Sequence, residues 1–449
     1  MLFNSYTFIF LFLLPALFAF WVLKLHKAGI WFLVVASVVF YAQWSLQHLF
    51  ILLTSVVVNY IFALVMERNR KYAKSLLITI LLLNLFPLIY YKYSYFLNMV
   101  DTPLILPLAI SFFTFQQIAF QVDLYYKKIE FFSFREYLFF ILFFPQLVAG
   151  PIVHYNHIIP QVLHAKWKHF NKTYFAAGVF LFSIGLFKKV VLADSFAPYA
   201  NGAFESVAQG LSVFDAWIGI FAYSFEIYFD FSGYSDMAIG LGLLFGIRLP
   251  LNFNSPYKSR NIVEFWRNWN ITLSNFLRDY IYIPLGGSRV RVSRQIFNLI
   301  VTMIIGGIWH GAGWTFVLWG FLHGLFLGLV HLFHGKLMRV VAVGVTFFVV
   351  TLLWVLFRAD NFSSALHYYG ILFDISNLQL HRVAFTTAFV FVFSFIVVWF
   401  TKNSCELVAY NEKHLHVKAW HGALAGVAFF VALKFMAGAP AQTFVYFNF

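Results

Sequence analysis

Charged residues are scarce in this chain, and their scarcity excludes a water-soluble globular protein. Only 11% of the 449 residues are charged, whereas soluble domains carry about 25%. In contrast, 62% of the residues are hydrophobic, 22% are aromatic, and the mean hydropathy is +0.79. A protein folded in water could not bury this much apolar surface. Lipid must therefore solvate a large part of the chain.

Cysteine is almost absent as well. Cys405 is the single cysteine, which excludes an internal disulfide and a cysteine-rich metal site. The histidines show no HExxH spacing, so we expect no bound metal. We also expect no cleavable signal peptide, because the first apolar stretch has no basic segment before it and no small-residue cleavage site after it. We expect that stretch to remain in the protein as a membrane span.

The basic residues do not indicate a nucleic-acid partner, although the net charge is +14. They occur in short clusters between apolar stretches, which is typical of loops that face an anionic cytoplasmic leaflet. Clusters at 24–27, 68–74 and 127–128 follow the first, third and fifth apolar stretches. All three fall on one side of a membrane if the N-terminus lies outside. The sequence therefore predicts a multi-pass protein, surrounded by membrane lipid, with an external N-terminus.

Apolar stretches close to 20 residues long recur along the whole chain, and about 20 helical residues cross a bilayer. We predict an all-α polytopic membrane protein with about eleven transmembrane helices. Several stretches are short or contain Pro and Gly, as Phe143–Pro151 does, so we also expect short or re-entrant helices. We find no repeat, no low-complexity segment and no water-soluble part. Residues 1–449 are therefore expected to form one membrane-embedded domain.

The segment 248–294 differs from its neighbours because it is much more polar. It contains the polar residues Asn252, Asn254, Lys258, Arg260, Asn261, Glu264, Arg267, Asn268, Asn270, Arg278 and Asp279. Such a segment is too polar to face lipid, so it must line water or lie buried in protein, and we place it on the cytoplasmic side. Polar clusters at or near membrane depth are functional by default.

His310 is the first candidate for chemistry. It lies in Gly306–Trp314, between two apolar runs. An imidazole at that depth needs a partner, and burial favours its neutral form, which suits a general base. The flanking glycines allow close approach by a substrate or another helix. The alternative is a histidine that only bonds a neighbouring helix.

His323 and Asn270 are two further polar residues near this region whose roles the sequence leaves open. His323 follows His310 by thirteen residues, which on one unbroken helix is about 20 Å along the axis and roughly the opposite face. The two histidines are therefore not predicted to act as a pair, and His323 is a candidate for a polar tunnel. The amide of Asn270 could hold an imidazole or a carbonyl oxygen in position. Helix capping or an interhelical hydrogen bond would explain Asn270 equally well.

Asp230 and Asp236 are two carboxylates near a helix break. They could form a proton relay, and Asp236 is a second candidate for a polar tunnel. Pairing with Lys188, Lys189 or Arg248 is the structural alternative, because carboxylates at this depth require a cationic partner.

A set of motifs in order along the chain resembles the membrane-bound O-acyltransferases, in particular their bacterial branch that acetylates alginate and peptidoglycan. The resembling pieces are Leu106–Phe115, Phe144–Pro151, Tyr228–Asp236, Pro250–Pro256, Phe265–Ser274, Arg278–Arg289, Trp309–Gly311, Trp354–Arg358 and Phe444–Phe449. No single piece is specific, but this many pieces in order are. The resemblance extends over almost the whole chain.

The resemblance implies a ring of helices around a central tunnel, where a cytoplasmic funnel meets an outer funnel at His310. The catalytic histidine of the family corresponds to His310, and its second polar residue to Asn270. Close bacterial relatives usually have histidine in the Trp-x-x-Ser/Thr-Leu-Ser context of that second position. Asparagine at this position is typical of eukaryotic branches, so the resemblance implies a polar helper and not a second base.

The resemblance also implies a substrate and further site residues. Acetyl-CoA is the expected thioester donor, as a substrate and not as a bound cofactor. Its expected binding residues are Trp266, Arg278, Asp279, Arg289 and Trp309, because basic groups near the cytoplasmic mouth suit its phosphates. The C-terminus is similar to an aromatic motif in a small partner peptide of the D-alanylation system. By that analogy Tyr446 is an acyl relay, whereas the alternative is an aromatic anchor at the membrane interface.

The sequence thus predicts an O-acyltransferase of the bacterial inner membrane. Acetyl would pass outward for O-acetylation of an extracytoplasmic polysaccharide of the alginate or peptidoglycan type, with a periplasmic SGNH-type acetyltransferase or esterase as partner. The alternatives are a polytopic transporter or channel without acyl-transfer chemistry, and a docking subunit for a periplasmic transferase. A transporter would explain the spans and the polar segment equally well.

Overall fold

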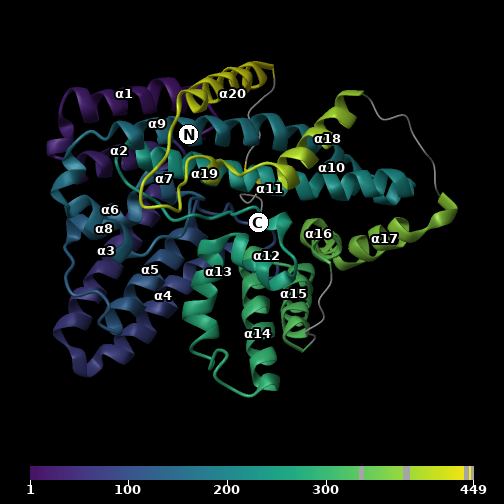
Figure 1. Ribbon diagram of the computed structural model, residues 1–449. Coiled ribbons are helices and arrows are strands. Elements are labelled where there is room, and N and C mark those ends of the chain that lie inside the picture. The colour runs from purple at the N-terminus through teal and green to yellow at the C-terminus, as the bar shows by residue number, and fades with distance from the viewer. Residues whose placement is uncertain (333–337, 378–384, 439–443, 446–449) are drawn as a thin grey trace. The chain divides into compact units, whose positions relative to one another are not determined.

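The structure of the protein is a computed structural model, and it describes residues 1–332, 338–377, 385–438 and 444–445 (Figure 1). Every regular element in these ranges is a helix. The chain divides into two compact units: residues 1–184, 234–250 and 412–427 form the first, and residues 185–233, 251–411 and 428–449 form the second. Each unit combines segments that are far apart in the sequence.

Seven helices among the described residues are long and apolar enough to cross a membrane. They are Leu46–Arg68, Arg70–Tyr93, Lys172–Glu205, Val292–His310, Trp314–Leu332, Arg339–Arg358 and Ala419–Gly438. Shorter apolar helices occupy Thr7–Val22, Ile30–Ala42 and Thr387–Phe400. The prediction of an all-helical polytopic membrane protein is confirmed. The count of long spans is below the expected eleven because several apolar stretches fold as shorter helices.

The first unit contains eight α-helices and parts of three more. Its helices are α1 (Leu14–Leu17), α2 (Ile30–Ala42), α3 (Leu46–Arg68), α4 (Ala73–Tyr93), α5 (Ile110–Tyr125), α6 (Phe134–Leu142), α7 (Phe144–Leu147) and α8 (Tyr155–Leu163). The long helices α9 (Lys172–Phe187), α11 (Val213–Leu244) and α20 (Ala419–Gly438) belong partly to each unit. At 9 and 4 residues, α6 and α7 are too short to span, as expected for the segment around Phe143–Pro151.

Buried amides join α3, α4 and α5 in the first unit. Asn59 and Asn84 exchange two side-chain hydrogen bonds of 2.8 Å each. Gln117 accepts a hydrogen bond of 2.9 Å from Asn59, and Gln121 donates to the Asn59 carbonyl at 2.7 Å. Polar side chains that bond across helices hold membrane bundles together where no hydrophobic effect between helices is available.

The second unit contains the remaining helices. They are α10 (Asp194–Glu205), α12 (Ile262–Asn268), α13 (Ile271–Leu277), α14 (Val292–His310), α15 (Trp314–Leu332), α16 (Arg339–Arg358), α17 (Phe362–Phe373), α18 (Phe385–Phe400) and α19 (Ser404–Leu407). A π-helical turn, Arg278–Tyr282, follows α13 directly. Most of the polar segment 248–294 therefore folds as short helices and turns that precede α14.

Helices α14 and α15 lie side by side as an antiparallel pair (Figure 1). Glycines let their backbones approach closely. A Cβ atom added at Gly307 would lie 2.2 Å from the Phe316 carbonyl oxygen, and one added at Gly320 would lie 2.3 Å from the Met303 carbonyl oxygen. Gly324 continues this seam, because its Cβ would lie 2.5 Å from the Ile300 Cα. Small residues at such positions allow the close packing that membrane helices require.

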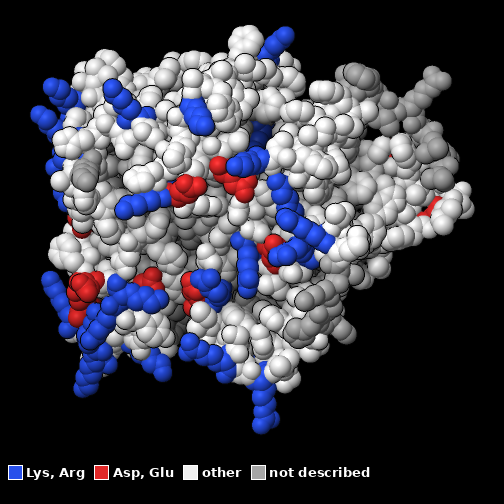
Figure 2. Space-filling view, in the orientation of Figure 1, with Lys and Arg blue, Asp and Glu red and all other residues white. Residues whose placement is uncertain are grey.

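The two ends of this helix pair differ in charge. Arg289, Arg291 and Arg294 lie before or within the first turn of α14, whereas the connection 311–313 carries no charged residue. Lys and Arg also make up most of the charged side chains on the face shown in Figure 2, where large areas carry no charge.

Candidate active site

His310 is the last residue of α14, and its side chain is buried at 3% exposure. Three aromatic rings surround the imidazole. The ring centroids of Trp309, Trp319 and Phe357 lie 4.8, 5.3 and 5.1 Å from that of His310. The imidazole is thus held within protein and not against lipid, as predicted from its sequence context.

His323 lies much closer to His310 in space than an unbroken helix would allow. The expectation of about 20 Å and an opposite face assumed one helix through both residues. The chain instead breaks after His310, and α15 runs back along α14. His323 consequently packs against the same indole as His310, with its ring centroid 4.6 Å from that of Trp319. The assumption of an unbroken helix was wrong, because Gly311 and Gly313 end α14 and permit the turn.

His323 is fully buried and fixes a neighbouring indole. The Trp266 Nε1–H donates to the His323 Nδ1 at 3.2 Å. Because an indole nitrogen can only donate, Nδ1 must accept, which leaves the proton of the neutral imidazole on Nε2. Among the described residues, that Nε2 has no hydrogen-bond partner.

Asn270 precedes α13 and has a left-handed backbone, with φ of 42° and ψ of 55°. Asparagine adopts this conformation more readily than most residues. Its side chain does not cap α13, it is 2% exposed, and its Nδ2 has no partner among the described residues. The helix-cap alternative for the side chain is therefore wrong.

An aromatic path connects Asn270 to His310 within the second unit. Trp269, the residue before Asn270, lies 5.2 Å from Trp354 between ring centroids. Trp354 in turn stacks on Trp319 at 6.0 Å, and Trp319 contacts His310. The residue next to Asn270 therefore belongs to the same buried aromatic cluster as His310.

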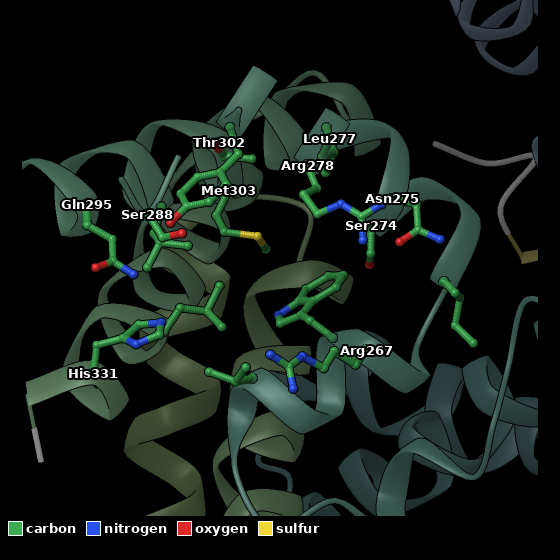
Figure 3. Close-up of a pocket in the computed structure, with 16 residues that line it drawn as sticks. Arg267, Ser274, Asn275, Leu277, Arg278, Ser288, Gln295, Thr302, Met303 and His331 are labelled. Atoms are coloured by element: carbon green, nitrogen blue, oxygen red, sulfur yellow. The ribbon is translucent and has the colours of Figure 1, made fainter. Parts of the chain in front are cut away.

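A cavity of about 410 Å³ opens beside this cluster, lined by α12, α13, α14, α15 and the segment that joins α13 to α14. Its exposed lining residues include Arg267, Arg278, Ser288 and His331, whereas Trp266 at the opposite end is buried. Figure 3 shows Arg278 beside Ser274 and Asn275, with Gln295 and His331 on the other side of the cavity. The cavity thus has a basic, polar rim and an apolar inner end.

Arg278 carries a fixed positive charge at this rim. Its Nε and Nη2 donate to the two carboxylate oxygens of Asp279 at 2.7 and 3.1 Å. This hydrogen bonding raises the pKa of the Arg278 guanidinium further above its ordinary value. Asp279 itself does not line the cavity, so its contribution to the rim is to orient Arg278.

The cavity lies along the face of α14 that carries His310. Gln295, Leu299 and Met303 line it at four-residue spacing, and His310 follows Met303 by seven residues on the same face. Two helical turns correspond to about 10 Å. Trp266 lines the cavity and contacts Trp319 at 5.7 Å between ring centroids. Trp319 in turn contacts His310, which does not itself line the cavity.

Several other predicted residues have different positions. Arg289 and Trp309 do not line the cavity, although Trp309 contacts His310. Asp236 belongs to the first unit and is buried. Tyr446 lies outside the described residues. Its described neighbour Val445 donates its backbone N–H to Asp230 Oδ2 at 2.8 Å.

Asp230 is paired, as the structural alternative predicted. Lys189 Nζ lies 2.7 Å from Asp230 and 2.8 Å from Asp194. The C-terminal segment packs on the same place, because the Phe444 ring lies 5.4 Å from that of Phe231. The described residues include no group of three His, Cys, Asp or Glu side chains that could hold a metal ion.

Trp319 and His331 were not predicted as residues of this region, and Arg267 was predicted only as one of the polar residues of the segment 248–294. The sequence feature that could have indicated Trp319 is the pair of glycines after His310, Gly311 and Gly313. A helix break there folds α15 back on α14 and brings Trp319 beside His310. Arg267 and His331 carry no local sequence pattern that distinguishes them from ordinary interfacial residues.

Comparison with known proteins identifies the family. Residues 37–341 match the family model of the membrane-bound O-acyltransferases. The peptidoglycan O-acetyltransferase of Helicobacter pylori is 43% identical over 415 residues, which cover 82% of this chain and 78% of the relative. The probable alginate O-acetylase AlgI of Pseudomonas aeruginosa is 37% identical over 411 residues, covering 85% and 77% of the two chains.

A more distant similarity exists to the teichoic acid D-alanyltransferase of Streptococcus thermophilus, at 30% identity over 247 residues, or 50% of this chain and 56% of the relative. The family match covers more than half of the chain, and the apolar helices cross a membrane several times. The chain is therefore a multi-pass membrane protein and an acyltransferase, a member of the membrane-bound O-acyltransferase family.

Proposed function

We propose that this O-acyltransferase takes acetyl from acetyl-CoA at the cytoplasmic face of the inner membrane and passes it outward for O-acetylation of a polysaccharide of the peptidoglycan or alginate type. The observation that carries this proposal is the position of His310, two helical turns beyond the inner end of a basic-rimmed cavity, on the same helix face. The family membership leaves no reason to prefer a transporter or a docking subunit.

The charges around the cavity support a phosphate-bearing donor that enters from the cytoplasm. Arg267 and Arg278 lie at the rim, and guanidinium groups bind phosphate well. Arg289, Arg291 and Arg294 are at the same end of α14, which the positive-inside rule assigns to the cytoplasm. The cavity volume of about 410 Å³ lies within the usual range of small-molecule sites and suits a slender thioester arm.

The chemistry requires a base, and His310 is the proposed base. The imidazole removes the proton of an acceptor hydroxyl, whose oxygen attacks the thioester carbonyl carbon. The carbon–sulfur bond then breaks, and the imidazolium returns the proton to the departing thiolate. One ester and one free thiol result, so no further reactant is needed. Asn270 orients the reacting groups, and Trp266, which lines the cavity, guides the donor toward His310.

The proposed acetyl acceptors are supported by the names of the relatives and by the position of the C-terminal segment. Relatives of this chain are named for O-acetylation of peptidoglycan and alginate, which supports a polysaccharide as final acceptor. Tyr446 is the proposed hydroxyl that carries acetyl outward. The docking of Val445 on Asp230 supports this role, because it holds the C-terminal segment on the unit that contains His310. A periplasmic SGNH-type transferase would complete the transfer.

The purified protein in lipid nanodiscs, supplied with radiolabelled acetyl-CoA, tests this proposal. The wild-type chain should release free thiol and transfer label to a hydroxyl acceptor, either Tyr446 or an added oligosaccharide. His310→Ala should lower that transfer on the order of 10³-fold, because it removes the base while the membrane insertion of the chain stays intact.

His48→Ala is the matched control. His48 is also a buried histidine in an apolar helix, but it belongs to α3 of the first unit, whereas His310 and Asn270 belong to the second. This variant should keep the wild-type rate. Wild-type transfer by His310→Ala would disprove the role of His310, and absence of any transfer by the wild-type chain would disprove acetyl-CoA as donor.

A further inference from the structure

Two buried nitrogen donors in the aromatic cluster around His310 and Trp319 have no acceptor among the described residues. The Trp319 side chain is 1% exposed and that of His323 is 0% exposed. Neither the Trp319 Nε1 nor the His323 Nε2 has a hydrogen-bond partner in the described part of the chain. Buried polar groups are nearly always hydrogen-bonded in folded proteins, so each exception requires an explanation.

The explanation must involve an acceptor, because both groups donate. An indole nitrogen cannot accept a hydrogen bond. The His323 Nε2 carries the proton of the ring, since Nδ1 accepts from Trp266 at 3.2 Å. Trp319 contacts both histidines, with ring centroids 5.3 Å from His310 and 4.6 Å from His323. The Trp319 ring thus lies against the proposed base and the His323 ring lies against the same indole, in a buried site where hydrogen bonds to a developing charge are strongest.

We propose that the Trp319 Nε1–H and the His323 Nε2–H donate to the thioester carbonyl oxygen when it becomes an oxyanion. This inference rests on the proposed function, since it assigns two further residues to the same acyl transfer. When the acceptor oxygen attacks, the carbonyl π electrons move to oxygen, and the two donors stabilise that negative charge. When the intermediate collapses, the charge returns to re-form the carbonyl and the thiolate leaves with the proton held by His310.

The surroundings of both donors fit this assignment. The Trp319 ring packs against Trp354 and Phe357 with ring centroids 6.0 and 5.1 Å away. The His323 ring is held through its Nδ1 by Trp266. Both donors are therefore fixed before a substrate arrives, and preorganised donors lower a barrier because they need no reorientation during the reaction.

Trp319→Phe tests the first donor, because phenylalanine keeps an aromatic ring and removes the N–H. In nanodiscs with acetyl-CoA, the variant should show kcat lowered about 10²- to 10³-fold, as for other single oxyanion donors. Its KM should change little, since the interaction forms only in the transition state. Trp217→Phe is the matched control and should keep the wild-type kcat. The indole nitrogen of Trp217 donates to the Leu372 carbonyl at 3.0 Å, and Trp217 does not line the cavity.

Two substitutions of His323 distinguish a role as hydrogen-bond donor from a role in packing alone. In His323→Asn the amide oxygen takes the position of Nδ1 and can still accept from Trp266, but the donor at Nε2 is lost. In His323→Gln the amide nitrogen reaches the position of Nε2 and restores the donor. We expect kcat to fall about 10²-fold in the Asn variant and to recover at least tenfold from that level in the Gln variant.

The outcomes distinguish this inference from the proposed function. Wild-type turnover together with a Trp319→Phe kcat within about threefold of wild type would overturn the inference alone. The inference is also overturned if the KM of Trp319→Phe rises as much as its kcat falls, or if His323→Asn has a higher kcat than His323→Gln. No turnover by the wild-type chain would overturn the proposed function. Binding of a thioether analogue of acetyl-CoA verifies that each variant is folded. If the Trp319→Phe variant does not bind this analogue, the two His323 variants alone test the inference.

Discussion

Asn270 combines an unusual backbone conformation with a proposed role in the site. Its φ of 42° lies in the left-handed region, where a β-carbon is strained and asparagine is better tolerated than most residues. Its buried amide nitrogen has no partner among the described residues. The proposed role of that amide can therefore be tested only with a substitution that relieves the backbone.

Asn270→Gly separates the two contributions, because glycine accepts positive φ without strain. We expect the Gly variant to unfold at nearly the wild-type temperature but to transfer acetyl more slowly, on the order of 10²-fold, since the reacting groups lose their orientation. Asn270→Ala should lose the same activity and also about 1 kcal/mol of folding stability. Thermal unfolding and turnover, measured side by side, check both. Full activity of the Gly variant would mean that the amide has no part in the reaction.

At this scale the sequence predicted candidate residues, His310 and Asn270, but not the side chains that surround them. His310 and Asn270 were apparent from their contexts, since an imidazole between apolar runs and a polar segment beside a membrane span are both unusual. Trp319 was not, because 22% of the residues are aromatic and one more tryptophan in an apolar run carries no signal. Its importance follows only from the turn that places it against His310.

At the scale of elements, the α14–α15 pair positions the site. The two helices contact each other through glycines, and the face they share with α12 and α13 holds both the cavity and His310. The two apolar runs on either side of His310 fold as α14 (Val292–His310) and α15 (Trp314–Leu332). Hydropathy fixes the extent of such helices, but it does not predict which faces meet.

Gly324→Ala should weaken this helix pair. A methyl group there would lie 2.5 Å from the backbone Cα of Ile300, which cannot move away as a side chain can. Overpacking of this kind destabilises by about 1–3 kcal/mol. The thermal unfolding temperature in detergent should fall accordingly, and acetyl transfer should fall with it because the cavity wall is displaced.

The control is Gly344→Ala on α16, where an added Cβ would meet no atom within 4 Å. Alanine is also the better helix former, so this variant should be as stable as wild type or more stable by up to about 1 kcal/mol. If Gly324→Ala and Gly344→Ala unfold at the same temperature, the glycine seam does not hold α14 against α15.

At the scale of the whole molecule, composition alone predicted the class of protein. The positions of the basic residues predicted its orientation in the membrane. The 11% of charged residues and the long apolar stretches predicted a polytopic helical membrane protein, and the seven candidate spans confirm it. The short buried helices α6 and α7 lie where Pro and Gly interrupt an apolar stretch. The grouping of segments such as 185–233 with 251–411 could not be predicted, because it depends on contacts between residues distant in sequence.

The orientation remains a prediction, and α14 offers a direct test of it. The chain has one native cysteine, which is buried, so Cys405→Ser gives a background without reactive thiols. In that background, Ser293→Cys reports the arginine-rich end of α14, and Trp314→Cys reports the uncharged end, since both positions are exposed.

A membrane-impermeant maleimide applied to intact spheroplasts should label Trp314→Cys at once and Ser293→Cys only after permeabilisation. The physical reason is that arginines near a span are retained on the cytoplasmic side. The reverse pattern would place the basic cavity rim outside, where no acetyl-CoA is available, and would contradict the proposed donor. Equal labelling of both cysteines without permeabilisation would mean that α14 does not cross the membrane, and the route from a cytoplasmic donor through His310 to an external acceptor would lose its physical basis.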